Sequence, residues 1–175
     1  MPEGRDSTLG DFPTPISSKF FIENTFGISN ANTKTFILML ASENPRSFVS
    51  GARVDLKVTL KEANRTEFHH LMPRNFLKES KQNRIFDESA LANFAFMSRA
   101  DNRRLGGDAP SVYRAKMADN VSEILSTAMC PESIFEDSYQ PFIEERAGIL
   151  MMKAKELCGP DGGAVSRESS PSNNS

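Results

Sequence analysis

The sequence predicts an α+β domain that is mostly helical, with a two-stranded hairpin and a short helix embedded among longer helices. Near the middle of the chain, two short apolar runs are separated by a long charged segment, and the second run leads into a polar stretch rich in arginine. In the second half of the chain, apolar residues recur at steps of three and four, as they do on one face of a helix. Together these observations favour the order strand, loop, strand, short helix, with further helices around it.

The length of 175 residues suits one domain with a flexible segment at each end. Residues 1–15 are polar and proline-rich, which predicts a flexible lead-in. Residues 160–175 consist largely of Gly, Ser, Asn and Pro, and we expect them to be disordered. Residues 16–159 then form the domain, with the hairpin and its short helix at about 66–106.

A helix and a strand are expected before the hairpin. Asn32 is a suitable N-cap for a helix with apolar residues at helical spacing, and Pro45 follows the end of that helix. Between Val54 and Leu60, apolar residues alternate with polar ones, which predicts a strand with one buried face. The apolar positions are Phe36, Ile37 and Leu40 in the helix and Val54, Leu56, Val58 and Leu60 in the strand.

The first strand of the hairpin contains the only two histidines of the chain, His69 and His70. In a regular strand their side chains would point to opposite faces, so a shared site requires the strand to end or bend there. Pro73 interrupts regular pairing just after them. A long charged loop is expected at 74–89, and the second strand is expected at Leu91–Met97.

Asn93 lies inside this second apolar run. A buried amide without a hydrogen-bond partner costs about 1–3 kcal/mol, so Asn93 is expected to be hydrogen-bonded and to orient the loop that carries the histidines. The short helix that follows carries Asn102, and Asp101 or Ser98 can cap it.

Three further helices complete the expected fold. The first covers Pro110–Asp119 and has proline near its start, and the second covers Val121–Met129. The third begins near Pro141 and is stopped by Gly159 and Pro160. The inward-facing residues, in the order of the helices, are Val112, Ala115 and Met117; Ile124, Leu125 and Ala128; and Ile143, Ala147, Leu150, Ala154 and Leu157.

Composition favours a cytoplasmic protein outside the membrane. No apolar run approaches the roughly 20 residues of a membrane span, and no signal peptide is visible at the N-terminus. Cys130 and Cys158 are isolated, so we expect both to be reduced thiols.

The net charge of −2 conceals a basic region around the histidines. From Lys61 to Lys116, 11 Lys and Arg stand against 7 Asp and Glu, whereas residues 118–163 hold 3 against 9. A polyanion such as DNA would be attracted to the first region, although an ordinary solvated surface can give the same count.

The residue types around the histidines suggest a chemistry. A metal-dependent nuclease needs an imidazole that takes a proton from water near neutral pH, and a few ligands that hold a divalent cation against a phosphate. His70, His69 and Asn102 are the residues here that could meet these requirements. Adjacent histidines are also common as half-buried strand residues with satisfied hydrogen bonds, so both interpretations stay open on residue types alone.

The order His-His-x-x-Pro, then Asn93, then Asn102 followed by Arg103, resembles the HNH endonucleases, also called His-Me-finger or ββα-metal nucleases. The surrounding sequence is similar to the C-terminal nuclease region of GmrSD-type restriction proteins. Those proteins carry a ParB-like nucleotide-hydrolysing domain N-terminal to this region. The resemblance covers Phe36 to Leu157 and is strongest from Glu67 to Tyr113. The segments that carry it are Glu67–Leu77, Asn102–Gly106, Pro110–Tyr113 and Phe142–Arg146.

This resemblance implies a ββα-metal finger that binds one divalent metal ion, Mg²⁺ or Mn²⁺/Ni²⁺. His70 matches the general base that takes a proton from the attacking water. His69, at a position where many members have Asp, and Asn102 match the metal ligands; an imidazole ligand favours Mn²⁺ or Ni²⁺ more than a carboxylate would. Asn93 matches a residue that helps to hold the His70 loop, and we count it with the catalytic residues.

The implied activity is that of a metal-dependent endonuclease or nickase that hydrolyses phosphodiester bonds of phage or otherwise foreign DNA in a restriction or anti-phage defence system. Arg103, Arg104, Arg74 and Lys78 are candidate contacts to the DNA backbone. A ParB-like nucleotide-hydrolysing domain or subunit, absent from this chain, would be a partner. The alternative is a non-cleaving DNA-binding or structural module of a defence complex.

Overall fold

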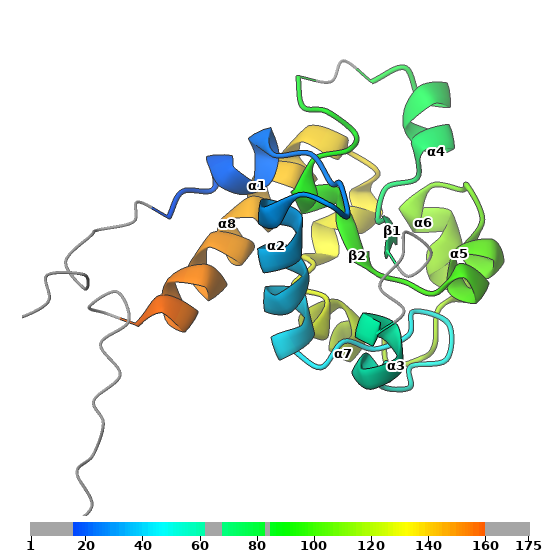
Figure 1. Cartoon of the computed structure of the whole chain (residues 1–175). Helices are drawn as coiled ribbons and strands as arrows, with labels where there is room; N and C mark the ends of the chain where they lie inside the picture. Colours follow the sequence, from blue (N-terminus) through cyan, green and yellow to red (C-terminus); the bar gives the residue numbers. More distant parts are fainter. Residues whose placement is uncertain (1–15, 62–67, 83–84, 160–175) are drawn as a thin grey trace, which may run out of the picture.

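The computed structural model describes residues 16–61, 68–82 and 85–159, so the expectations for residues 1–15, Glu67 and residues 160–175 lie outside this part of the chain. Within it, the protein is mostly helical and has one two-stranded antiparallel sheet, which confirms the α+β class (Figure 1). The elements, with η for a 3₁₀ helix, are α1 (Lys19–Glu23), α2 (Ala31–Ser42), α3 (Leu56–Lys61), β1 (Phe68–His70), α4 (Arg74–Glu79), η3 (Leu91–Asn93), β2 (Phe94–Phe96), α5 (Arg99–Leu105), α6 (Pro110–Tyr113), η4 (Arg114–Lys116), α7 (Val121–Thr127), η5 (Glu132–Glu136) and α8 (Tyr139–Cys158).

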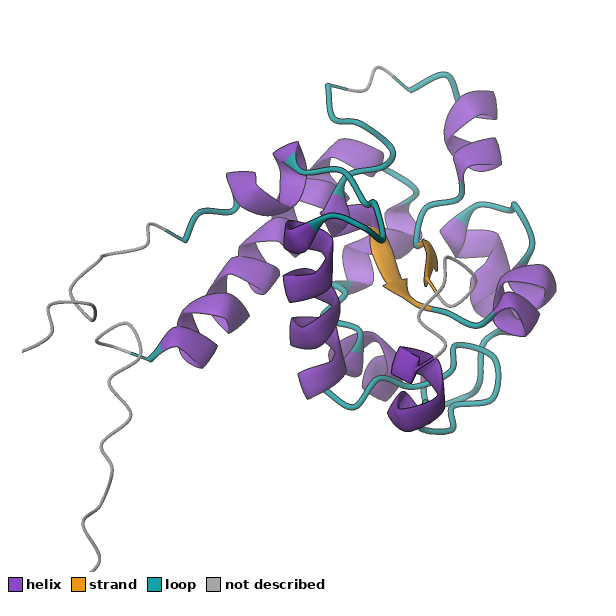
Figure 2. Cartoon of the chain, viewed as in Figure 1, coloured by secondary structure: helices purple, strands orange, loops and turns teal. Residues whose placement is uncertain are grey.

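The sheet lies in the middle of the molecule, with helices on both sides (Figure 2). In the antiparallel register, Phe68 pairs with Phe96, His69 with Ala95, and His70 with Phe94. The two strands are not joined by a tight turn, because α4 and η3 lie in the connection between them. The expected second strand is therefore shorter than Leu91–Met97, since its first three residues form η3.

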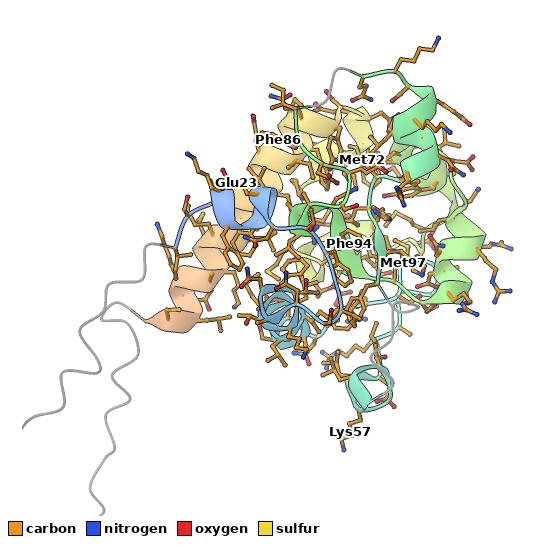
Figure 3. The ribbon with its side chains drawn as sticks, turned by 45° about the horizontal axis from the view of Figure 1, so that its top comes forward. Glu23, Lys57, Met72, Phe86, Phe94 and Met97 are labelled. Carbon is orange, nitrogen blue, oxygen red and sulfur yellow. The ribbon has the colours of Figure 1, made fainter. Side chains whose placement is uncertain are left out.

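An aromatic layer covers one face of this sheet. The ring of Phe26 lies 4.2 Å from Phe94 and 5.5 Å from Phe68, measured between centroids, and Phe68 lies 4.7 Å from Phe96. Each such pair adds about 0.5–1.5 kcal/mol beyond the burial of its area. In Figure 3, Met72, Phe94 and Met97 lie together around the sheet, whereas Lys57 projects from α3 toward solvent.

The first long helix, α2, was predicted with the wrong cap. The N-cap is Asn30, whose side-chain oxygen accepts a hydrogen bond from the backbone N–H of Asn32 at 2.8 Å. Both asparagines suit an N-cap, and the sequence does not decide which of them lies one residue before the first helical turn. The apolar residues were predicted correctly, because Phe36, Ile37 and Leu40 are buried.

The strand expected between Val54 and Leu60 is wrong, because this segment forms α3. Asp55 begins the helix: its carboxylate accepts from the backbone N–H of Lys57 at 3.0 Å, and its carbonyl accepts from Thr59 at 2.9 Å. Over so few residues an alternating pattern also fits a helix, since Leu56, Thr59 and Leu60 lie three and four residues apart. These residues are buried or half-buried.

The later helices follow the prediction in part. α7 buries Ile124 and Leu125 as expected, and α8 buries Ile143, Ala147 and Leu150. Leu157, near the end of α8, is 54% exposed, which corrects its expected place in the core.

The helix expected at Pro110–Asp119 is shorter, because α6 ends at Tyr113 and η4 follows. Val112 is 55% exposed and Ala115 is exposed, so both were placed wrongly, and Met117 is half-buried against the core. Tyr113 is the residue that α6 turns inward.

Two further expectations concern thiols and membranes. Cys130 is a buried free thiol and Cys158 an exposed one, which agrees with the prediction that neither forms a disulfide. Among the described helices, none combines the length and apolarity needed to cross a membrane.

Candidate active site around His70

His70 is the last residue of β1, and its imidazole lies on the aromatic face of the sheet. The ring centroid is 4.3 Å from that of Phe94, its partner in the register, with an interplanar angle of 45°. Its Nε2 atom is buried and has no hydrogen-bond partner among the residues that the structure describes. A buried nitrogen without a partner is uncommon in folded proteins, and it often marks a position where a ligand or a proton is taken up.

The environment of His70 keeps its imidazole neutral at neutral pH. The pKa of His70 is lowered from its ordinary 6.5 to about 4, mainly because burial disfavours the charged form. The positive charge of Arg74 lowers this pKa as well, as does His69, while Glu88 and Asp87 raise it. A neutral imidazole has a free lone pair on one nitrogen, so it can accept a proton.

Asn93 holds the chain just after His70. Its side-chain Oδ1 accepts from the backbone N–H of Met72 at 2.9 Å, and its Nδ2 donates to the carbonyls of Met72 at 3.2 Å and Glu88 at 2.9 Å. Its own carbonyl accepts from the N–H of Leu71 at 2.7 Å. Asn93 is fully buried in η3, and not in a strand as predicted; a 3₁₀ turn lets one amide reach both Met72 and Glu88.

His69 leaves the strand on the face opposite to His70, because successive side chains of a strand alternate. Its partner Ala95 is buried, whereas His69 itself is half-buried. The structure therefore does not place the two imidazoles on one face. The strand does end at His70, as the sequence requires for a shared site, and the chain bends at Leu71 and Met72.

Asn102 lies on α5, which begins after Ser98, one of the two caps that the sequence offered; Asp101, the other, lies inside the helix. The Ser98 hydroxyl accepts from the backbone N–H of Asp101 at 3.0 Å and caps the helix. Asn102 is half-buried, and among the described residues its side-chain amide makes no hydrogen bond. The loop after α5 packs against α4, since a Cβ placed at Gly107 would lie 3.1 Å from the Asn75 amide. α5 is thus connected to the helix that follows the histidines.

Arg103 and Arg104 are exposed on α5. Within residues 16–61, 68–82 and 85–159, neither forms an ion pair; Arg103 makes only a 3.4 Å hydrogen bond from Nε to the carbonyl of Arg99. Asp101 instead accepts from Ser47, and Asp108 pairs with Lys116 at 2.7 Å. The two guanidinium groups are therefore available to an anionic ligand.

Arg74 and Lys78 lie four residues apart on α4, so they share one side of this helix. This segment was expected to be a loop, and Pro73 begins the helix instead. Arg74 is 63% exposed and its Nε lies 2.5 Å from the Glu88 carboxylate. Lys78 is exposed and has no ion pair among the described residues. An open groove of about 590 Å³ lies between Arg74 and the segment that includes Asp87 and Glu88.

The metal ligands suggested by the sequence can be tested by their chemistry. No three His, Cys, Asp or Glu residues of the described segments lie close enough together to hold a metal ion, so a closed protein cage is not built there. His69 and Asn102 would offer one imidazole nitrogen and one amide oxygen. Such a pair fits a divalent ion that keeps most of its positions for water and phosphate oxygens, as Mg²⁺ does in many phosphate-handling sites.

Comparison with models of known families, with curated proteins and with solved structures finds no match. The resemblance to HNH nucleases therefore stays a prediction made on the motifs of this sequence.

Two residues around the site were missed in the sequence. The Tyr113 hydroxyl donates to the carbonyl of Leu71 at 2.8 Å, and burial raises the pKa of Tyr113, so the phenol stays protonated. Arg146 is fully buried and donates to carbonyls on both sides of Asn93. Its signal was present in α8, because Arg146 lies three residues after Ile143 and four before Leu150, on the apolar side of the helix.

Proposed function

We propose that this chain is a metal-dependent DNA endonuclease or nickase of the HNH type, with His70 as the general base. The observation that supports this most is the His70 imidazole, neutral at physiological pH, whose Nε2 lacks a hydrogen-bond partner in the described part of the chain, while Asn93 fixes the backbone of Met72 two residues later. β1, β2 and α5 would form the ββα-metal finger. A merely structural histidine would be expected to have both nitrogens satisfied.

In this proposal His70 Nε2 accepts a proton from the water that attacks the phosphodiester. An approaching phosphate brings a negative charge, which raises the pKa of a neighbouring imidazole and makes it a stronger base. The Phe94 ring packs against the imidazole, and the Asn93 amide fixes the backbone of Met72 two residues later, so the proton acceptor would be in place before substrate binds.

His69 and Asn102 would hold the divalent ion. Because His69 leaves β1 on the face opposite to His70, the ion and the base could act on one phosphate only beyond the end of the strand, where the chain bends at Leu71 and Met72. When bound, the ion supplies charge neutralisation for the pentacovalent phosphate and for the departing 3′ oxygen. Arg103 or Arg104 would position a non-bridging phosphate oxygen, because a guanidinium can donate two parallel hydrogen bonds. Arg74 and Lys78 would contact the DNA backbone along α4.

The substrate class follows from the resemblance alone: foreign DNA, such as phage DNA, cut within a restriction or anti-phage defence system. A ParB-like nucleotide-hydrolysing domain or subunit would control it. The basic surplus between Lys61 and Lys116 is compatible with a polyanionic substrate.

A second candidate, a non-cleaving DNA-binding or structural module, is favoured by the burial of Nε2. A buried atom takes a proton from water only after a neighbouring group has moved aside. In a DNA-binding module the arginines of α5 would still contact DNA, but His70 would not act as a base.

One experiment separates these functions. Supercoiled plasmid is incubated with the full chain in Mg²⁺, Mn²⁺ or Ni²⁺, with and without a chelator, and DNA binding is measured in parallel. The nuclease nicks plasmid only with metal; a binding module retains DNA without nicking; a structural module does neither. A folded sample that never nicks at high enzyme concentration refutes the proposal for the isolated chain.

A further inference from the structure

Arg146 lies in the interior of the protein without an acidic partner. It belongs to α8, its side chain is 0% exposed, and among the described residues it pairs with no carboxylate. Four hydrogen bonds to backbone carbonyls take the place of an ion pair. Burial lowers the pKa of Arg146 to about 10, so the guanidinium stays charged at neutral pH.

The four acceptors come from two segments that are distant in the sequence. Nη1 donates to the carbonyls of Ala92 at 2.6 Å and Phe94 at 2.8 Å. Nη2 donates to Ala128 at 3.0 Å, and Nε donates to Met129 at 3.2 Å. The latter two carbonyls lie at the C-terminal end of α7, where the helix dipole favours a positive charge.

The first segment is the one that holds the histidine. Ala92 and Phe94 flank Asn93, so Arg146 fixes the backbone on both sides of the amide that binds Met72. Phe94 also pairs with His70 in the sheet and packs on its ring. A displacement of this backbone would therefore reach His70 both through Asn93 and through Phe94.

We propose that Arg146 is a positioning residue of the His70 site, which links α7 and α8 to the segment that orients the general base. The role of Arg146 in catalysis rests on the proposed function, in which His70 accepts a proton from the attacking water. Arg146 acts by geometry, because its planar fork presents donors in fixed directions to acceptors on two sides. A lysine at this position would keep the charge, but its single nitrogen cannot reach all four carbonyls.

The test compares Arg146→Lys with Leu150→Ala in the full chain. Leu150 is also fully buried and lies one turn further along α8, so its truncation destabilises the fold by about 2–5 kcal/mol without removing a hydrogen bond to η3 or β2. Hydrogen exchange is measured at the amides of Leu71 and Met72, which bond to Asn93, and at Leu40 of α2 as a reference.

In Arg146→Lys, protection at Leu71 and Met72 is expected to fall at least about tenfold more than at Leu40, because the backbone around Asn93 loses its bonds to Arg146 and opens locally. In Leu150→Ala, all three positions are expected to lose protection by a similar factor. Equal losses at the three positions in Arg146→Lys overturn the proposal. This comparison needs no cleavage, so it stands even if the chain is not a nuclease.

The rate of DNA cleavage by Arg146→Lys tests the role of Arg146 in catalysis. Arg146→Lys is expected to lower kcat by about 10²-fold with unchanged affinity for DNA and metal, since a small misplacement of a catalytic group costs about that much. A folded Arg146→Lys that cleaves like the wild type also overturns the proposal.

If Arg146→Lys does not fold, hydrogen exchange of the wild-type protein tests the proposal instead. The Nε–H of Arg146 and the amides of Leu71 and Met72 are then expected to share one opening reaction, with protection factors within about threefold of each other. Amides that open more than about tenfold more often than the Arg146 Nε–H would show that the backbone after His70 moves while the Arg146 hydrogen bonds stay formed, and would refute the inference.

Discussion

Replacement of Asn93 by alanine tests how the loop after His70 is held. The change removes three hydrogen bonds, from Met72 N–H and to the carbonyls of Met72 and Glu88, at 2.9, 3.2 and 2.9 Å. The N–H of Met72 is the most costly group to leave, because Met72 is fully buried and an N–H has only one bond to make. An unsatisfied buried group costs about 1–3 kcal/mol, and water that enters the space of the lost amide can satisfy part of the set. We therefore expect a loss of about 2–5 kcal/mol in the free energy of unfolding.

Urea unfolding followed by circular dichroism measures this loss. Asn102→Ala is the matched control, because it removes the same side chain from a half-buried position without a hydrogen bond among the described residues. The control is expected to stay within about 0.5 kcal/mol of the wild type. If Asn93→Ala is as stable as Asn102→Ala, the hydrogen bonds around Met72 do not hold the loop, and the account of the site loses its support.

Three further predictions concern protonation, metal and DNA. Because the pKa of His70 is 6.5 when unfolded and about 4 when folded, its contribution to stability is fully present above pH 6.5 and is lost as the pH falls through 4. The free energy of unfolding should thus decrease by up to about 3 kcal/mol over this range, and the His70→Gln variant should lack this part of the decrease in urea titrations. His69→Ala and Asn102→Ala should bind the metal more weakly, and part of the lost activity should return at high metal concentration. If these variants need the same metal concentration as the wild type, neither residue is a metal ligand. Arg103→Ala or Arg104→Ala should weaken binding similarly on all DNA sequences and reduce the slope of log affinity against log salt by about one, and an unchanged slope in both assigns them to the solvated surface.

The helices were predictable where local signals agree with the packing. α5 has a serine N-cap, and α7 and α8 carry apolar residues at helical steps, so their positions follow from capping and periodicity. α3 was mistaken for a strand because six residues can fit two periods, and the alternation of Leu56 with polar neighbours does not reveal that the Asp55 carboxylate accepts a hydrogen bond from Lys57 at the start of a helix.

The site was predictable in its residue types but not in its geometry. His70 and Asn93 are brought together, since the Asn93 amide binds the residue two positions after His70. Adjacent residues of a strand point to opposite faces, so His69 and His70 could share a face only if the strand ended or bent before His70; the sequence does not show that β1 continues to His70. The position of Arg146 on the apolar side of α8 was visible in the sequence, but its role was not, because its acceptors come from two distant segments.

Single-turnover cleavage of a DNA duplex by the wild type and by His70→Ala, at saturating metal, tests whether His70 is the base of a metal-dependent nuclease. We expect metal-dependent cleavage by the wild type and a rate about 10²–10⁴-fold lower for His70→Ala, with DNA and metal affinities unchanged. His70→Ala cleaving at the wild-type rate would contradict this expectation, as would a folded wild type that binds DNA and metal but never cleaves.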